Sequence, residues 1–505
     1  MNKGMGGPPG PPDDNALIAE RRAKLARQRD KGGAFPNDFR RDAFASDLHA
    51  VWGARTDEWL EANPVRVRVA GRMMFKRVMG KASFAKLQDS SGQIQVYLQA
   101  QALGSAYDDF KGWDVGDIVG AQGILMRTRA GELSVRAESM RLLVKALRPL
   151  PDKWHGLADT ETRYRRRYVD LMVNEETREV FRTRTRIVRF LRDFLDAQGF
   201  LEVETPMMQP IPGGAVARPF VTRHNALDQD MYLRVAPELY LKRLLVGGFE
   251  RVYEINRNFR NEGLSTQHNP EFTMLELYQA FADCADFMAL VERMMQGLAD
   301  AVAGGREIEY QGRRFELAAP FARRSLEDCI AEANPELDRS RLRDPAHLRQ
   351  ACVRHAIEMR PGDGAGALQL ALFEKTAESR LLQPTFVHSY PAEVSPLSRG
   401  RESDPFLVDR FEFYVDGREL ANGFSELNDP EEQAERFREQ VTRRRAGDEE
   451  AMYFDADYVR ALEYGMPPAA GLGVGIDRLV MLFTGAPSIR DVLLFPQLRN
   501  EPDQD

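Results

Sequence analysis

Residues 257–278, RNFRNEGLSTQHNPEFTMLELY, decide the fold of the larger part of the chain, because they read as a strand, a polar loop and a second strand. In the second strand Leu275 and Leu277 point to one face and Glu276 points to the other, since side chains alternate along a strand. A carboxylate on a strand whose other face is apolar needs a partner, because burying it unpaired is very costly. A structural ion pair would meet this need, so this strand alone leaves a functional role open.

A hairpin is predicted at residues 411–427, around the turn Asp416-Gly417, which is a strong two-residue hairpin signal. Pairing across this turn makes Glu412 and Glu419 diagonal neighbours on one face, about 7–8 Å apart. Two like charges so placed repel each other unless a cation lies between them, and carboxylate ligands beside a phosphate substrate suit Mg²⁺. An exposed polar hairpin face is the alternative interpretation.

Two other polar residues of this hairpin, Asn422 and Glu426, fall on the opposite face by simple alternation. A β-bulge near Gly423 would bring them to the face that carries the carboxylates. The alternation pattern leaves this point open.

A glycine-rich strand followed by a helix is predicted at residues 471–483, GLGVGIDRLVMLF. Glycines at a period of two leave one strand face bare, with room for a flat group or a close backbone approach. Asp477 is expected to cap the helix, which places Arg478 in its first turn. Packing alone is the commoner reason for such glycines, but the arginine at the strand end favours a nucleotide site. The dinucleotide fingerprint is excluded because it needs a glycine where Ile476 stands, and no P-loop occurs.

The length of 505 residues exceeds what one hydrophobic core supports, so two or more domains are expected. Short alternating runs separated by turn signals indicate a small β-barrel, and the later strand candidates indicate a mostly antiparallel sheet flanked by helices. The expected segments are a disordered Gly/Pro-rich start at 1–14, a helical extension at 15–58, the barrel at 59–147, a proline-containing linker at 148–152 and the large domain at 153–505.

The large domain is expected to contain an amphipathic helix at residues 177–198, which Gly199 can end. A strand at residues 200–204 follows, and Pro206 stops it.

The composition, with 43% hydrophobic and 29% charged residues, is typical of a soluble enzyme and shows no membrane-spanning run. Three distant cysteines outside any CxxC pattern argue against disulfides and a zinc site, so a reducing cytoplasmic setting is expected. The net charge of −7 means that any RNA contact must be local. One basic stretch is a candidate, with a solvated helix face as the alternative; it comprises Arg21, Arg22, Lys24, Arg27, Arg29 and Lys31.

These motifs together resemble those of class II aminoacyl-tRNA synthetases, and over nearly the whole chain they are similar to the lysine-specific bacterial type. The segments that carry the resemblance include FLEVETPMMQPIPGGAVARPF, RNFRNEG, HNPEFTMLELY, YPAEVSPL, FSELNDP and GLGVGIDRLVMLF. The resemblance implies an α+β protein, with an OB-fold barrel that reads the anticodon and a class II catalytic domain built on an antiparallel sheet.

The implied activity is that of an ATP-dependent lysine–tRNA ligase, which forms lysyl-adenylate and pyrophosphate and then transfers lysine to the 3′ end of tRNA(Lys). Mg²⁺ is the implied cofactor, and the implied location is the cytoplasm without membrane contact. The helix ending at Gly199 and the strand through Pro206 resemble the motif that builds a two-fold homodimer.

The resemblance also assigns roles to individual residues. The two catalytic residues are Arg260 and Arg478. The lysine pocket comprises Gly214, Glu238, Arg260, Glu276, Tyr278, Asn422, Phe424 and Glu426. The ATP site comprises Arg260, Glu262, His268, Asn269, Phe272, Glu412, Glu419, Gly475 and Arg478. The magnesium ligands are Glu412 and Glu419, and the anticodon readers are Phe84, Gln95 and Glu132.

Within these sets Arg260 would grip the α-phosphate and the amino-acid carboxylate, as suits a planar bidentate donor. Phe272 and Arg478 would sandwich the adenine ring, and His268 would meet the terminal phosphates. The excess of carboxylates in the pocket is what a substrate with two ammonium groups requires. Phe84 would stack on a base, although barrel core is its commoner role.

Three alternatives remain. A synthetase of the same fold for aspartate or asparagine is disfavoured by the acidic pocket. A stand-alone relative that lysylates a protein lacks the barrel. A non-catalytic RNA-binding protein would have damaged ATP motifs.

Overall fold

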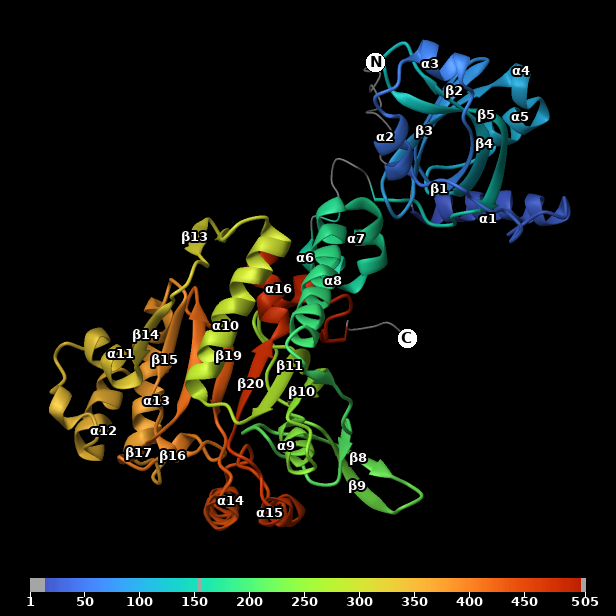
Figure 1. The fold of residues 1–505 in the computed structure, drawn as a ribbon. Coiled ribbons are helices and arrows are strands. Elements are labelled where there is room, and N and C mark those ends of the chain that lie inside the picture. Colours follow the sequence, from blue (N-terminus) through green and yellow to red (C-terminus); the bar gives the residue numbers. More distant parts are fainter. Residues whose placement is uncertain (1–13, 152–156, 158, 501–505) are drawn as a thin grey trace, which may run out of the picture. The chain divides into compact units, whose positions relative to one another are not determined.

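The computed structural model describes residues 14–151, 157 and 159–500, which form two compact units, Met1–Ala158 and Asp159–Asp505 (Figure 1). The first thirteen residues of the expected disordered start, and the last residue of the expected linker, lie outside the described residues.

The first unit contains, among its described residues, a five-stranded closed barrel, which confirms the barrel prediction. Neighbouring strands follow the order β1 (Arg66–Met79), β2 (Ala82–Gln88), β3 (Gln93–Gln99), β5 (Leu133–Val144) and β4 (Ile118–Arg127). Inward side chains such as Val96, Val119 and Val135 are fully buried. The other helices of this unit are α2 (Ala45–Trp52), α3 (Asp57–Ala62), α4 (Ala100–Leu103) and α5 (Ser105–Gly112).

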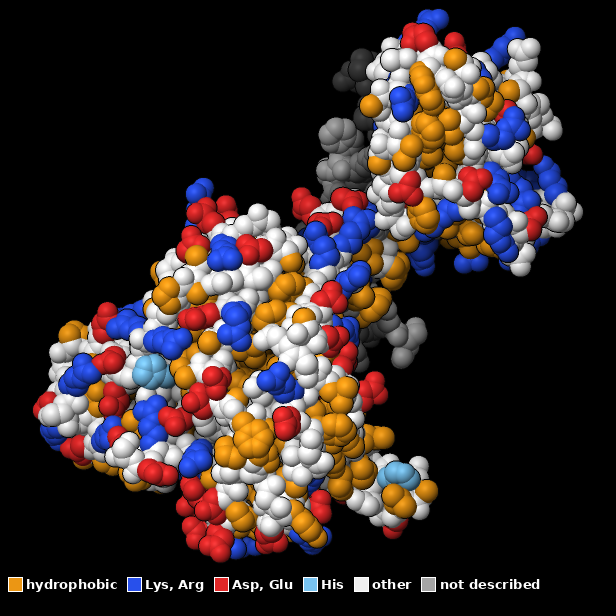
Figure 2. Space-filling model, viewed as in Figure 1, with side chains coloured by type: hydrophobic (Ala, Val, Ile, Leu, Met, Phe, Trp, Pro, Cys, Tyr) orange, Lys and Arg blue, Asp and Glu red, His pale blue; other side chains and the backbone are white. Residues whose placement is uncertain are grey.

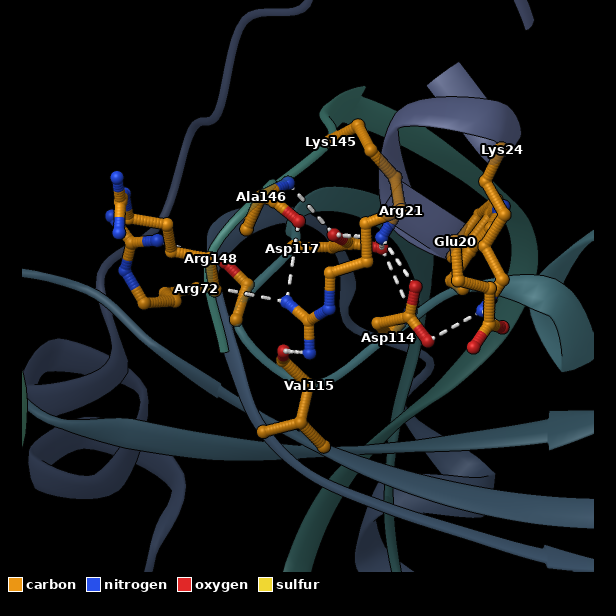
Figure 3. Close-up of polar contacts among 12 residues, drawn as sticks. Glu20, Arg21, Lys24, Arg72, Asp114, Val115, Asp117, Lys145, Ala146 and Arg148 are labelled. Atoms are coloured by element: carbon orange, nitrogen blue, oxygen red, sulfur yellow. Dashed lines mark hydrogen bonds and ion pairs between the residues drawn. The ribbon is translucent and has the colours of Figure 1, made fainter. Parts of the chain in front are cut away.

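Helix α1 (Asp14–Asp30) is attached to the barrel by part of the basic stretch (Figure 3). Lys24 Nζ lies 2.7 Å from Asp114 Oδ1. Buried Arg21 donates to the carbonyl oxygens of Val115, Ala146 and Arg148. These two cations therefore serve the fold, and the RNA interpretation of the stretch stays a prediction.

The second unit is built on an eight-stranded sheet within residues 159–500. Its pairs are antiparallel except at the two outer pairs, so the mostly antiparallel prediction is confirmed. The strand order is β14 (Ala322–Ser325), β15 (Thr385–His388), β18 (Arg410–Val415), β19 (Arg418–Ser425), β20 (Ala469–Gly475), β11 (Glu271–Ala280), β10 (Arg251–Phe259) and β6 (Leu201–Glu202).

One face of this sheet is covered by apolar helices (Figure 1). Leu275 and Leu277 of β11 pack there, as the alternation predicts, so Glu276 points to the opposite face. The covering helices are α8 (Glu175–Asp196), α10 (Cys284–Leu298) and α16 (Ile476–Thr484). The short helix α17 (Ile489–Val492) adds Ile489 and Val492 to the same core. The other helices of the unit are α6 (Thr160–Arg165), α7 (Arg167–Val173), α9 (Glu238–Val246), α11 (Leu326–Ala333), α12 (Pro345–Arg354), α13 (Ala365–Thr376), α14 (Pro430–Arg445) and α15 (Ala456–Glu463).

Smaller elements complete the unit. A three-stranded sheet joins β7 (Met208–Gln209), β9 (Gln229–Leu233) and β8 (Phe220–His224). Two hairpins pair β12 (Glu307–Tyr310) with β13 (Arg313–Glu316) and β16 (Gly400–Arg401) with β17 (Asp404–Val408). Short helical turns lie at η1 (Ala299–Ala303), η2 (Arg339–Arg341), η3 (Glu378–Arg380) and η4 (Ala392–Val394).

Helix α8 ends as predicted, with Gly199 in the left-handed region at φ +77°. The Phe200 amide then donates to the Leu195 carbonyl at 3.1 Å. The following strand β6 is shorter than predicted, because it pairs only with Val252 and Tyr253 at the sheet edge. In the described part of the chain, no helix is both long and apolar enough to span a membrane.

Candidate active site

A cavity of about 630 Å³ lies on the polar face of the large sheet. It is lined by side chains from β11 and the loop before it, the β18–β19 hairpin, β20, and the starts of α9 and α16. The sequence-predicted residues that line it are Gly214, Glu238, Arg260, Glu262, His268, Asn269, Phe272, Glu276, Tyr278, Glu412, Glu419, Asn422, Phe424, Gly475 and Arg478. Of the set expected in this unit, Glu426 does not line the cavity.

Glu276 is buried in the cavity wall. Its carboxylate accepts from Asn258 Nδ2 at 3.4 Å and from the Tyr278 hydroxyl at 3.2 Å. Burial and the neighbouring charge of Glu238 raise its pKa to about 8. Among the described residues it takes part in no ion pair, so the structural ion pair considered from the sequence is not formed and this acid faces a space where a cation would be stabilised.

Two more carboxylates share one buried lysine. Lys242 Nζ donates to Glu238 Oε1 at 2.6 Å and forms an ion pair with Glu426, and its own side chain has no exposed surface. Burial alone would lower the pKa of Lys242, but the two carboxylates outweigh it and raise that pKa. Glu426 thus lies behind the cavity wall. The sequence analysis missed Lys242, although its position four residues after Glu238 on a helix was an available signal.

Gly471 allows this packing. A Cβ there would lie 2.1 Å from Glu426 Oε1 and 2.4 Å from Tyr278 Cε1. The bare strand face predicted from the glycine pattern is therefore filled at this position by protein side chains. Gly214 also has a local reason, since its φ is +90° and a Cβ would lie 2.9 Å from Glu238 Cβ.

Arg260 lines the end of the cavity that the sequence assigns to the nucleotide. Its guanidinium carbon is 5.1 Å from the centroid of the Phe272 ring. Its Nε is buried and has no hydrogen-bond partner among the described residues. A buried charged donor without a partner is expensive, so an anion in the cavity would satisfy it. Phe272 thus faces Arg260, and its predicted sandwich with Arg478 stays a prediction.

Arg478 closes the same end of the cavity. It donates to the Glu419 backbone carbonyl at 2.7 Å and to Glu419 Oε2 at 3.2 Å, and it lies 3.4 Å from His268 Nε2. Burial and the charge of Arg478 lower the pKa of His268. Asn269 fixes the loop before β11. Its side-chain Nδ2 donates to the Glu271 carbonyl, and its Oδ1 accepts from the Gln497 backbone N–H.

The prediction that Asp477 caps helix α16 is wrong. The helix begins at Ile476 after Gly475, so Asp477 lies inside the first turn. Its carboxylate instead accepts from the Thr273 amide at 2.8 Å and from Arg184 of α8 at 2.6 Å. This fixes the start of α16, and with it Arg478, against β11.

The β18–β19 hairpin contains the bulge that the sequence left open. Tyr414 pairs with Glu419 as predicted, but Phe413 pairs with Ala421, so the extra residue is Leu420 rather than one near Gly423. The bulge places Asn422 directly opposite Glu412 and brings both onto the cavity face.

The donor set at Glu412 and Glu419 fits Mg²⁺ shared with a substrate phosphate. Glu412 is already held by Tyr390, Tyr414 and Arg410, while Glu419 contacts Arg478. Burial and the nearby Glu412 raise the pKa of Glu419, which means that added positive charge would be stabilised. No group of three acidic, histidine or cysteine side chains gathers as a metal site in the described part of the chain. Two carboxylates completed by phosphates and water are a usual Mg²⁺ arrangement.

Two further acids near this pair were missed by the sequence analysis. Glu374 of α13 lines the cavity, and Glu378 follows one turn later. Burial, then the charges of Glu374, Glu412 and Glu419, raise the pKa of Glu378 to about 7. Their segment carried no motif that would have indicated them.

The predicted anticodon residues lie together on the barrel. Phe84 points outward from β2, since Ser83 and Ala85 beside it are fully buried, so it is not a barrel-core residue. Its ring centroid is 5.0 Å from that of Tyr97, which the sequence analysis missed. Gln95 Nε2 donates to Ser134 Oγ at 2.9 Å, and Glu132 pairs with Lys86 at 2.9 Å.

Comparison with known proteins agrees with this geometry. The family model described as tRNA synthetases class II (D, K and N) matches residues 159–499, and the OB-fold nucleic acid binding domain matches residues 67–143. The fold is thus that of a class II tRNA synthetase with an OB-fold domain, which confirms the fold class.

Full-length relatives narrow the class. The lysine–tRNA ligase of Thioalkalivibrio sulfidiphilus is 59% identical over 490 residues, which cover 97% of this chain and 98% of the relative. That of Xanthomonas oryzae pv. oryzae is 58% identical over 505 residues, covering 99% of this chain and 100% of the relative. The chain belongs to the lysine–tRNA ligase family of class II tRNA synthetases.

Proposed function

We propose that the protein activates L-lysine with ATP and transfers the lysine to the 3′ end of tRNA(Lys). The observation that carries this proposal is the polarity of one cavity, which has buried carboxylates at one end and an arginine with an unpaired donor at the other. A diammonium amino acid and a triphosphate are the ligands whose charges complement these two ends.

In the first half-reaction Glu238 and Glu276 hold the two ammonium groups, while Arg260 binds the lysine carboxylate and the α-phosphate. A carboxylate oxygen then attacks the α-phosphorus in line, and pyrophosphate leaves. Positioning and charge neutralisation supply most of the rate, because no proton has to be removed from a carboxylate. No general base is therefore assigned.

Glu412 and Glu419 would hold Mg²⁺. The ion would supply positive charge to the triphosphate and its leaving pyrophosphate. Arg478 and His268 contribute charge and hydrogen bonds at the same end of the cavity.

In the second half-reaction the ribose 3′ hydroxyl of the terminal tRNA adenosine attacks the lysyl carbonyl of the mixed anhydride, and AMP leaves. The outward ring of Phe84, beside Tyr97, supports binding of an unstacked anticodon base on the barrel. Charging of tRNA serves protein synthesis, so we infer a cytoplasmic location, which fractionation of cells would test.

We also infer a two-fold homodimer. Apolar side chains are exposed around β6 and β7, and Figure 2 shows such side chains gathered beside β8 and β9. These exposed residues are Leu201, Met207, Met208 and Val221. Analytical ultracentrifugation should give twice the chain mass for the parent and the single-chain mass for Leu201→Asp; a monomeric parent would refute the inference.

Lysine-dependent ATP–pyrophosphate exchange tests the catalytic assignment. Arg260→Ala should lose exchange by at least about a hundredfold, because it removes a charged hydrogen-bond donor at the reacting phosphate. Arg257→Ala is the matched control, since that arginine lies on the adjoining strand with a half-exposed side chain and does not line the cavity. Full exchange in the Arg260 variant, or exchange driven by aspartate or asparagine, would overturn the proposal.

A further inference from the structure

The buried ammonium of Lys242 lies beside the amino-acid end of the cavity, and the proposed reaction gives it no role. It lies behind the wall, because Lys242 and Glu426 do not line the cavity, whereas Glu238 does. The Phe424 ring lines the cavity and lies 5.3 Å from the Lys242 Nζ. The ammonium is thus covered by an aromatic ring and held by two carboxylates.

The charges in this region can be counted. Three buried carboxylates gather here, Glu238, Glu276 and Glu426: besides burial, the charge of Glu238 raises the pKa of Glu276, and the charges of Glu238 and Glu276 raise the pKa of Glu426. With Lys242 the group carries a net charge of −2 when all are ionised. A diammonium amino acid brings two positive charges to this end of the cavity. They balance the net charge of −2, which the three carboxylates have only because Lys242 is present. Without Lys242, three carboxylates would lie close together in a buried site, and at least one of them would take up a proton.

We propose that Lys242 is a positioning residue that sets the charge of the amino-acid pocket, by neutralising Glu426 and orienting Glu238 toward the cavity. The inference rests on the proposed lysine pocket. It explains why an enzyme for a cationic substrate keeps a cation of its own so close to that substrate. Because Lys242 neutralises Glu426, the net charge that the substrate meets is that of Glu238 and Glu276.

The alternative is that Lys242 only fills space and supports the fold. The two roles differ in what happens when the pair is removed step by step. Glu426→Gln alone should leave a net charge of −1 and weaken lysine binding. Adding Lys242→Met to that variant returns the net charge to −2, so lysine binding should improve, although a second buried side chain has been changed.

The experiment compares the parent, E426Q and K242M/E426Q by lysine-dependent ATP–pyrophosphate exchange, with the KM for lysine and for ATP measured separately. We expect E426Q to raise the KM for lysine about tenfold, because the pocket loses one negative charge. The double variant should recover most of that loss. The KM for ATP should stay within about twofold in all three. A double variant that is no better than E426Q overturns the role of Lys242.

The single variant K242M is not needed for the decision, because it leaves two unpaired buried carboxylates and can fail to fold. E276Q separates this inference from the proposed pocket. If E276Q raises the KM for lysine while the double variant shows no recovery, the pocket stands and the role of Lys242 is refuted. If E276Q leaves the KM for lysine unchanged, the pocket is refuted, and the inference falls with it.

Discussion

Acidification should weaken lysine binding through a single carboxyl group. Glu276 is 4% exposed, and burial with the charge of Glu238 raises its pKa to about 8. In the ligand-free enzyme it is therefore mostly protonated at neutral pH. Binding of a substrate ammonium requires the ionised form, so the proton has to leave first.

The size of the effect follows from that pKa. About one molecule in two has Glu276 ionised at pH 8, about one in eleven at pH 7 and about one in a hundred at pH 6. Because kcat/KM reports the ionisation of the free enzyme, its value for lysine should fall about fivefold from pH 8 to 7 and about ninefold from pH 7 to 6.

The assay is lysine-dependent ATP–pyrophosphate exchange at saturating ATP between pH 6 and 8. Glu276→Gln should be poor at every pH and should lose this slope, since it has no proton to release. Glu378, whose pKa is about 7, lies near the nucleotide end and also titrates in this range. The pH profile of kcat/KM for ATP is therefore measured as well, because it separates the titration of Glu378 from that of Glu276. A flat lysine profile in the parent, or an unchanged slope in the Gln variant, would refute the reasoning.

Three other outcomes are expected. Gly471→Ala should lower kcat/KM for lysine at least about fivefold with little change for ATP, because its Cβ would lie 2.1 Å from Glu426 Oε1; equal losses for both substrates would contradict this. Phe84→Ala should raise the KM for tRNA about fivefold to a hundredfold and leave exchange intact, whereas Phe35→Ala, which removes an exposed phenylalanine outside the barrel strands, should change neither; matching effects would count against base stacking. Burial raises the pKa of Glu276 from 4.5 in the unfolded chain to about 8 in the ligand-free fold, so folding stability is lost as pH rises from about 4.5 to about 8; the melting temperature should therefore fall more from pH 5 to 8 in the parent than in Glu276→Gln, and an equal or smaller fall in the parent would contradict this.

Strand alternation was sufficient to predict much of the site. It placed Leu275 in the core and Glu276 on the cavity face, and the turn at Asp416 gave the pairing of Tyr414 with Glu419. These features depend on side-chain parity and on a turn type, which are local properties of a sequence.

Other features depend on contacts between distant segments and could not be read locally. The helical spacing of Lys242 from Glu238 is a local signal, but its ion pair with Glu426 and its place beside Phe424 depend on how α9 packs against the sheet. Asp477 looked like a helix cap because the sequence did not reveal Arg184, 293 positions earlier, as its partner. The residue-by-residue roles came from resemblance to a family, and they stay predictions until the variants are measured.

The extra residue in β19 makes this strand unusually permissive to a change in length at one point. Removing Leu420 would leave Glu419 opposite Tyr414, Ala421 opposite Phe413 and Asn422 opposite Glu412, which is an unbroken ladder. A deletion on either side of the bulged pair would instead exchange the inner and outer faces of everything beyond it. Shortening of this hairpin therefore keeps the register only at Leu420, where it removes one buried side chain from the core, while the rest of the strand accepts replacement but not loss.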